Sequence, residues 1–437
     1  MESSSNPLVP PMVAEILSEV EGRWTGIAAA RDRIYRLRGS PGRETWAQML
    51  VCLHLVVSQL RHVDFALDGA VQPGDRPRAR VLVSEWLAGR IPFYDVRKLH
   101  SRVDWERVFD HANRLKLVAD PVERFSIEYS LPLWAADAIV KNLPEDAAAH
   151  LGAALLLPPP RTLRANTLRT TRESLITELR NQGIFAEPTR FAADGVTTPP
   201  FSDVFHMDLF HGGGFEAQDE ASQLCSEIVA PPPKGVVLDA CAGAGGKTLH
   251  LAALLKGQGV ILAVDAADYK IRDLKERARR AGAHQIRGVA VPESAWSAEV
   301  TTFAGKADRI LLDAPCSGLG SFRRKPEMRW KITQDDLPRL EQIQRDLLDR
   351  AAAHLKPGAR LIYSTCTLRP EENEHQITGL LARDGTLELV PIKEILGKAR
   401  AENITDPTGV MMRVFPHVQG TDGFFAAVLR KARQPKS

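Results

Sequence analysis

The chain has 437 residues, of which 44% are hydrophobic and 25% are charged. This is globular composition with room for two or three domains, which excludes a disordered, collagen-like or disulfide-stapled chain. The net charge of +3 is too small for binding nucleic acid by bulk charge, although a local basic surface is compatible with it. No secretory signal is apparent, and the most apolar run, MLVCLHLVV at 49–57, is too short to span a bilayer. We therefore expect a cytoplasmic protein with no membrane partner.

The cysteines are an odd number, widely spaced, without a CxxC pair or a Cys/His cluster at zinc-ligand spacing. This usage is typical of reduced thiols in a reducing compartment, and we expect no metal site. Cys52 and Cys225 fall within helical patterns, which favours packing in the core. The other three are Cys241, Cys316 and Cys366.

The first part of the chain, 1–140, is expected to be an all-α domain, because apolar residues recur at three- and four-residue intervals over 12–36, 44–67 and 81–117. A proline run at 158–160 then breaks the pattern. Shorter mixed elements follow, including TLRANTL at 162–168 and a polar helix at 171–182. We expect 141–214 to form a small α+β segment.

The last part, 215–437, alternates short apolar strands with helices. A continuous apolar strand is typical of a parallel sheet that is covered on both faces, and 337–355 has the pattern of an amphipathic helix. The alternation predicts a doubly wound α/β domain with its site at the carboxyl ends of the strands. The expected strands are VVLD (236–239), VILAVD (260–265), RILLD (309–313) and RLIYST (360–365).

A glycine-rich turn follows the first of these strands, in the sequence DACAGAGGKT at 239–248. Between a strand and a helix, such a turn lets a nucleotide-like ligand approach backbone amides and the helix N-terminus. It is not a phosphate-binding P-loop, because Cys241 stands where that loop has its first glycine. Asp265 ends the second strand, where dinucleotide folds hold a ribose hydroxyl. NAD, FAD and S-adenosylmethionine all fit this pattern, and a tight structural turn is the alternative.

Two further strands lead into cysteine motifs, Asp313-Ala-Pro-Cys316 and Tyr363-Ser-Thr-Cys366. In a parallel sheet both cysteines would lie on the same rim, where a thiol is exposed and its pKa can be tuned. A redox pair is one alternative, and two buried strand-end cysteines are another.

These motifs resemble those of the RNA cytosine-5 methyltransferases of the Nol/Nop/Sun type. The resemblance covers roughly residues 120–430. The helical part ahead of it is similar to the NusB-like domain of the bacterial 16S ribosomal RNA enzymes of that family. The segments that carry the resemblance are DACAGAGGKT, DAPCSGLGSFRRKPEMRW, YSTCTLRPEENE, TLRANTL, EAQDEASQL (216–224) and DGFFAAVL (422–429).

The resemblance implies a Rossmann-like methyltransferase domain at 215–437, a NusB-like RNA-binding domain at 1–140 and a small RNA-binding segment between them. It implies that Cys366 adds to carbon 6 of a cytosine, that Cys316 assists release of the methylated product, and that Asp313 binds the cytosine edge or the cofactor. S-adenosylmethionine would contact Asp239, Cys241, Ala242, Gly243, Ala244, Gly245, Gly246, Lys247, Asp265 and Asp313.

The chain departs from the family in two places. The family usually reads CAAPGGK, where this chain has CAGAGGK at 241–247. The family also has an aspartate after the third strand that binds the adenine amino group, and the matching region, IRGVAVPESAW at 286–296, has valine or alanine there. Glu293 is several residues out of register. We therefore expect S-adenosylmethionine to bind with weakened affinity.

Basic and aromatic residues are interleaved directly after the Cys316 motif. Basic side chains for phosphates beside aromatic rings for stacking are typical of a single-strand or flipped-base site, whereas a solvated charged face is the alternative. Arg164, in the middle segment, is a second candidate. The predicted RNA-binding residues are Arg323, Arg324, Lys325, Arg329, Trp330, Lys331 and Arg164.

The sequence therefore favours S-adenosylmethionine-dependent methylation of carbon 5 of a cytosine in RNA, with 16S ribosomal RNA as the expected partner and a monomer as the expected state. Transfer RNA is the alternative substrate. Outside the class of enzymes, the alternative is a non-catalytic RNA-binding factor in ribosome assembly that retains the methyltransferase fold. A dinucleotide oxidoreductase is disfavoured because it leaves both cysteine motifs unexplained.

Overall fold

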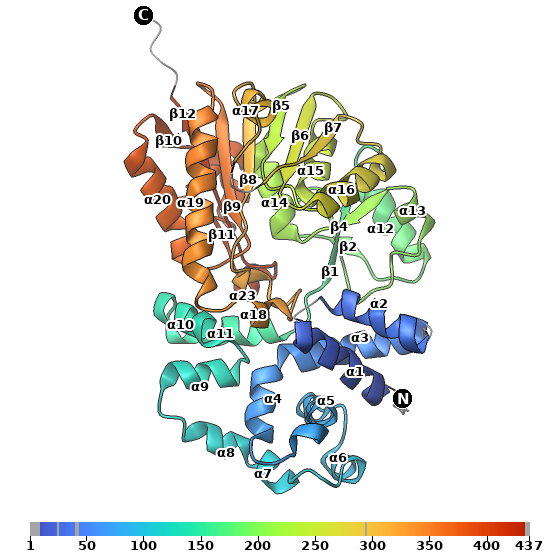
Figure 1. The fold of residues 1–437 in the computed structure, drawn as a ribbon. Coiled ribbons are helices and arrows are strands. Elements are labelled where there is room, and N and C mark those ends of the chain that lie inside the picture. Colours follow the sequence, from blue (N-terminus) through green and yellow to red (C-terminus); the bar gives the residue numbers. More distant parts are fainter. Residues whose placement is uncertain (1–8, 24–25, 40–42, 293–294, 433–437) are drawn as a thin grey trace, which may run out of the picture. The chain divides into compact units, whose positions relative to one another are not determined.

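The computed structural model describes residues 9–23, 26–39, 43–292 and 295–432 (Figure 1). The chain divides into two compact units. The helical unit comprises Met1–Pro158 and Ser321–Asp336, and the sheet unit comprises Pro159–Gly320 and Leu337–Ser437. The segment at 321–336, which follows the Cys316 motif in the sequence, is therefore part of the helical unit.

The helical unit confirms the all-α expectation for the N-terminal part. One apolar cluster joins α1, α2 and α3, and a second joins α4, α5, α6 and α7. The helices are α1 (Val9–Arg23), α2 (Ile27–Arg38), α3 (Arg43–Ser58), α4 (Leu60–Leu67), α5 (Arg76–Leu87), α6 (Phe93–Leu99), α7 (Trp105–Phe109), α8 (His111–Lys116), α9 (Pro121–Glu128), α10 (Leu133–Asn142), α11 (Glu145–Leu156) and α18 (Met328–Lys331).

The helical pattern at 44–67 is two helices rather than one, because the chain bends by 71° between α3 and α4. Within the described residues, no single helix has the length and apolar composition to cross a membrane, and only this bent pair, 45–58 with 60–67, meets those criteria when taken together. Much of the pair is buried inside the helical unit, where Leu53, Val56 and Val63 are inaccessible.

The sheet unit contains a small antiparallel sheet in the order β2-β3-β1-β4, which confirms the predicted α+β segment. Its elements are β1 (Arg161–Ala165), α12 (Arg172–Asn181), β2 (Glu187–Pro188), β3 (Gly195–Thr198), α13 (Asp208–His211) and β4 (Phe215–Ala217). Two predicted boundaries shift. The α11 helix, beyond residue 140, lies in the helical unit, and β4, beyond residue 214, belongs to the small sheet because it pairs with β1.

The larger sheet has the order β10-β12-β9-β8-β5-β6-β7, with β11 paired to β12. Strands β5 to β9 are parallel, whereas β12 runs antiparallel to β9. From β5 the chain moves to β6 on one side and later to β8 on the other, which creates a switch point between β5 and β8. The strands are β5 (Val236–Asp239), β6 (Val260–Asp265), β7 (Ile286–Ala290), β8 (Arg309–Asp313), β9 (Arg360–Thr365), β10 (Leu387–Leu389), β11 (Met412–Val414) and β12 (Phe424–Lys431).

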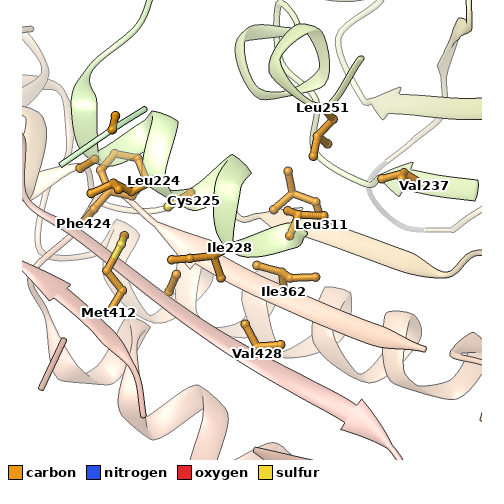
Figure 2. Packing of buried hydrophobic residues seen from close by; sticks show 14 of the residues in the cluster. Leu224, Cys225, Ile228, Val237, Leu251, Leu311, Ile362, Met412, Phe424 and Val428 are labelled. Atoms are coloured by element: carbon orange, nitrogen blue, oxygen red, sulfur yellow. The ribbon is translucent and has the colours of Figure 1, made fainter. Parts of the chain in front are cut away.

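Alternate residues of these strands enter two separate cores, one on each face, as the pleat of a sheet requires. Leu311, Ile362 and Val428 lie in the first core, which Figure 2 shows together with Leu224 and Ile228 of α14. The first core is covered by α14 (Glu220–Val229), α15 (Gly246–Leu254), α16 (Asp268–Ala281), α21 (Ile392–Leu396) and α22 (Lys398–Ala401). The second core is covered by α17 (Ala298–Ala304), α19 (Asp336–His354) and α20 (Glu374–Arg383). The doubly wound, Rossmann-like expectation is confirmed, with all four predicted strands at their predicted bounds. The prediction that Cys52 and Cys225 are core residues is also confirmed, since both are buried.

Candidate active site

The polar ends of four neighbouring strands meet at the carboxyl edge of the parallel sheet. Asp239 ends β5, Asp265 ends β6 and Asp313 ends β8, while Cys366 follows β9 directly. The switch point of a doubly wound sheet is the edge at which such folds bind their ligands. The edge therefore holds the predicted cofactor residues and both predicted reactive cysteines.

The turn between β5 and α15 depends on two glycines. Gly243 and Gly245 have φ of +55° and +87°, which disfavours other residues. A Cβ on Gly245 would also lie 2.8 Å from Cγ of Leu274. At Gly243 and Gly246 a Cβ would meet nothing within 4 Å, so there is room for a ligand against the backbone here. The other predicted turn residues, Cys241, Ala242 and Ala244, form the rest of this loop.

Asp265, at the end of β6, stabilises the same turn. Its carboxylate accepts hydrogen bonds from the backbone N–H of Gly243 (2.9 Å) and of Ala267 (2.9 Å). Each carboxylate oxygen can accept a further hydrogen bond. Asp265 therefore keeps acceptor capacity for a ligand while it fixes the loop.

Asp239 is a buried carboxyl group with one oxygen engaged. Oδ2 accepts a hydrogen bond from the Thr248 hydroxyl (2.7 Å), while Oδ1 has no hydrogen-bond partner among the described residues. Burial is the main cause that raises the pKa of Asp239 to about 7, and the nearby charge of Asp313 also raises it. An orphaned buried acceptor is costly unless a donor reaches it. The ammonium group of an amino-acid moiety has the charge and the donors for this position.

Lys247 links the turn to the third strand end. Its ammonium lies 2.6 Å from Oδ2 of Asp313 and 4.8 Å from the ring centroid of Phe424. Burial lowers the pKa of Lys247, but Asp313, together with Cys225 and Cys366, outweighs burial and the pKa is raised. The Ser364 hydroxyl donates to Oδ1 of Asp313 (2.9 Å). The Asp313 carboxylate is thus held from two sides, with about a third of its side chain exposed.

The two predicted reactive cysteines are adjacent. The Sγ atoms of Cys316 and Cys366 lie 3.5 Å apart, and no disulfide joins them. The hydrogen bond to Cys366, together with burial and the negative charges of Cys366 and Glu372, raises the pKa of Cys316 well above its usual value. The charge of Lys247 interacts favourably with a Cys366 thiolate. The pair therefore favours a protonated Cys316.

A buried carboxylate connects the loops that carry the two cysteines. Glu372 accepts hydrogen bonds from the backbone N–H (2.8 Å) and the hydroxyl of Ser317, next to Cys316. It also accepts from Arg369 (3.2 Å) and Thr367 (3.4 Å), in the loop after Cys366. Sequence reasoning did not single out Glu372. The acidic run PEENE, which belongs to the matched motif, was the available signal.

The predicted RNA-binding set divides by burial. Lys325 and Lys331 are exposed, Arg324 is half-buried and Arg323 is buried. Trp330 donates through its indole N–H to the carbonyl of Val57 (3.0 Å). For Lys325 and Lys331 contact with RNA remains a prediction.

Arg329 and Arg164 require a correction, because both side chains are buried and out of reach of RNA. Arg329 donates to the carbonyls of Ser58 (2.8 Å), Ser130 (2.9 Å), Leu155 (3.0 Å) and Phe322 (3.3 Å). Burial lowers the pKa of Arg329 to about 9 and that of Arg164 to about 10, with Glu216 opposing the latter shift. Arg329 therefore ties distant segments of the helical unit together, and Arg164 pairs in register with Glu216 in the small sheet.

The region that departs from the family lies after β7. Val291 is buried, and its N–H donates to the carbonyl of Asp265 (3.1 Å). Glu293, the considered substitute for the missing aspartate, lies outside the described residues. In the described part of the chain, no group of His, Cys, Asp and Glu residues is arranged to hold a metal ion.

Comparison with known proteins agrees with this geometry. A family model described as 16S rRNA methyltransferase RsmB/F matches residues 226–430, and an RsmF/B-like ferredoxin-like domain model matches residues 131–203. The probable ribosomal RNA small subunit methyltransferase B of Bacillus subtilis is 34% identical over 315 residues, which cover 72% of this chain and 69% of that protein.

Solved structures show the same architecture. The crystal structure of PH0851 is 25% identical with a TM-score of 0.79, covering 98% of this chain and 100% of that chain. A methyltransferase homologue from Pyrococcus horikoshii is 28% identical with a TM-score of 0.60, covering 71% of this chain and 99% of that chain. The cofactor is S-adenosylmethionine, and the open glycine turn and the orphaned Asp239 oxygen fit it. The chain belongs to the RsmB/F family of 16S ribosomal RNA methyltransferases and is an S-adenosylmethionine-dependent RNA methyltransferase.

Proposed function

We propose that this protein methylates carbon 5 of a cytosine in 16S ribosomal RNA, through a transient covalent bond between Cys366 and carbon 6 of the base. The observation that carries the proposal is the pair of thiols 3.5 Å apart beside Asp313, at the switch point of the sheet. The 16S substrate rests on the family description and on relatives described as small subunit methyltransferases.

The first step uses Cys366 as the nucleophile. Carbon 5 of cytosine is a poor nucleophile, so a thiolate must first add to carbon 6 and move an electron pair toward carbon 5. Lys247 favours the thiolate form of Cys366, because their opposite charges attract. Cys316 keeps its proton at this stage, since the hydrogen bond to Cys366 raises its pKa.

Asp313 positions the base during this addition. Its carboxylate, held by Lys247 and Ser364, has the acceptors for the exocyclic amino group and for a protonated ring nitrogen 3. A proton taken up at nitrogen 3 from water neutralises the negative charge that thiolate addition places on the ring, and it returns to water when the neutral product is released. S-adenosylmethionine, when bound, supplies the electrophilic methyl group that carbon 5 then takes up. Asp239 and Asp265 would hold its amino-acid and ribose parts.

Release of the product requires loss of the carbon 5 proton and cleavage of the bond between Sγ of Cys366 and carbon 6. In the covalent state Cys366 is a thioether and carries no charge. The hydrogen bond and the charge of Cys366, which are two of the causes that raise the pKa of Cys316, are then gone, while burial and the charge of Glu372 remain. Cys316 can therefore ionise and accept the carbon 5 proton, while the electron pair of the C–H bond forms the double bond that expels the Cys366 thiolate.

The test is methyl transfer to unmodified transcripts of 16S ribosomal RNA and of transfer RNA, followed by nucleoside analysis. The proposal predicts 5-methylcytidine in the 16S transcript alone, and none with Cys366→Ala. If only transfer RNA were methylated, transfer RNA would take the place of 16S ribosomal RNA as the proposed substrate. A protein that binds S-adenosylmethionine in isothermal titration but methylates neither RNA at any cytosine would contradict the proposed chemistry. A protein that does not bind the cofactor would be the non-catalytic assembly factor.

A further inference from the structure

Three arginines form a row across three adjacent strands of the large sheet. In the strand register Arg309 of β8 lies opposite Arg360 of β9, and Arg360 lies opposite Arg430 of β12. Like charges placed directly opposite each other destabilise a sheet. The row is therefore an arrangement that needs a compensating negative charge.

The row continues one face of the buried core. Two residues away from each arginine on the same strand are Leu311 of β8, Ile362 of β9 and Val428 of β12, which Figure 2 shows side by side. Because side chains alternate along a strand, the arginines point to the same face as these three apolar residues. They lie at the edge where β8 and β9 begin, whereas Asp313 and the cysteines lie at the edge where those strands end.

The side chains around the row neutralise it only in part. Arg309 donates to the carbonyls of Val229 (2.9 Å) and Ala230 (3.2 Å) at the end of α14, and Arg430 pairs with Glu388 (2.7 Å). The central guanidinium, that of Arg360, forms no hydrogen bond or ion pair within the described part of the chain. Burial and the charge of Arg430 lower the pKa of Arg360, and the charge of Glu394 opposes this shift without cancelling it.

The row lines a cavity of about 780 Å³. Lys356 and Asp308 also line this cavity and pair with each other at 2.7 Å, so that the charge of Asp308 offsets that of Arg309 only in part. Of the charged lining groups, Arg309 and Arg360 lack a carboxylate partner. We propose that this cavity, the arginine-row site, binds a phosphate group between Arg360 and Arg309, at the edge of the sheet opposite the active site.

A phosphate group fits because guanidinium groups bind its oxygens in pairs of parallel hydrogen bonds. The phosphate can belong to the backbone of the RNA substrate or to a free phosphate-bearing molecule. Both sources present the same oxygens to Arg360. The site does not depend on the chemistry proposed for the cysteines, and it can be tested by binding alone.

The experiment compares the full-length protein with Arg360→Gln and with a matched control, Arg287→Gln, an exposed arginine of β7 that pairs with Glu299. Melting temperatures are measured with inorganic phosphate and with chloride at equal ionic strength. In chloride, Arg360→Gln should melt at or above the wild-type temperature, since the like-charge repulsion is removed. Phosphate should raise the melting temperature of the wild type and of the control, but not that of Arg360→Gln.

The two sources of the phosphate group are distinguished by measuring the affinity for 16S ribosomal RNA as a function of salt concentration. If a backbone phosphate occupies the site, Arg360→Gln reduces the slope of log K against log salt by about 0.7 to 0.9, while the control changes it less. A phosphate-dependent melting shift without a slope change assigns the site to a free phosphate-bearing molecule. If Arg360→Gln alters neither the phosphate response nor the RNA slope, the arginine-row site does not exist.

Discussion

Replacement of Asp239 by asparagine should stabilise the protein without cofactor and weaken the binding of S-adenosylmethionine. The carboxyl group is buried, its Oδ1 has no partner among the described residues, and its pKa is raised to about 7. An asparagine has the same shape and cannot ionise. Its amide group can also keep a hydrogen bond with Thr248.

The magnitude follows from the difference in pKa between the folded and unfolded states. The folded value is about 7 and the reference value is 3.8, and a shift of this size corresponds to about 4 kcal/mol. Because the folded pKa is raised, the favourable contribution of Asp239 is fully present below pH 3.8 and is lost as the pH rises to about 7. The stability advantage of Asp239→Asn should therefore grow over this range and be constant at higher pH.

The assay is urea unfolding of both proteins at pH 5 and pH 8, together with isothermal titration of S-adenosylmethionine at pH 8. The variant should gain up to about 4 kcal/mol over the wild type at pH 8 and clearly less at pH 5. Its cofactor affinity should fall at least about tenfold, because a charged hydrogen bond to the ammonium is lost.

Asp384→Asn is the matched control, since the hydrogen bonds from Thr386 lower the pKa of Asp384. That change should reduce stability slightly above the ordinary carboxyl pKa and leave cofactor affinity unchanged. The reasoning is refuted if Asp239→Asn destabilises the protein at pH 8, or if it binds the cofactor as tightly as the wild type.

Three further outcomes are expected. Glu372→Gln should slow methyl transfer by about 10²-fold, because a misplaced catalytic pair loses its alignment, with cofactor affinity unchanged in titration. The free energy of unfolding of the helical unit should fall by up to about 3 kcal/mol as the pH falls from 6.5 toward 4. The reason is that burial lowers the pKa of His54 to about 4, so that the unfolded chain binds a proton that the folded chain does not. His54→Gln should reduce this dependence on pH in acid unfolding curves. Arg329→Met should destabilise the helical unit by about 3 kcal/mol or more in denaturant unfolding, since buried carbonyls lose their donor.

Each of these outcomes has a direct counter-result. Loss of cofactor affinity in Glu372→Gln would mean that the residue supports the whole fold rather than the cysteine loops. An unchanged acid slope in His54→Gln would assign the effect to another group. Lys331→Met, an exposed change on the same helix as Arg329, should stay within about 0.5 kcal/mol of the wild type. An equal effect of the two changes would contradict a structural role of the buried guanidinium.

The strands and the residues that gather at their carboxyl ends could be predicted because their signals are local. The strands of the parallel sheet are continuous apolar runs that end in a polar residue, and β5, β6, β8 and β9 have the bounds expected from that pattern. The cofactor turn needs glycines where the backbone has a positive φ, and these glycines can be seen in the sequence. Parallel strands then bring Asp313 and the two cysteines to one edge without any knowledge of the tertiary packing.

The positions of the arginines could not be predicted, because they depend on segments that are distant in the sequence. The basic and aromatic residues after Cys316 have the composition of an RNA-binding surface, but Arg329 is buried by carbonyls of α3, α11 and the loop after α9. The arginine row likewise requires β12 to pair with β9 in one register. Charge patterns alone do not distinguish these environments from a solvated surface.

The most direct test of the proposed chemistry is a denaturing gel of RNA incubated with S-adenosylmethionine and the wild type, Cys316→Ala or Cys366→Ala. Cys316→Ala should accumulate a protein–RNA band of reduced mobility, because addition proceeds and release is slow. Cys366→Ala should form no such band and transfer no methyl group. A band that persists in Cys366→Ala, or its absence in Cys316→Ala, would contradict the assignment of Cys366 as the nucleophile.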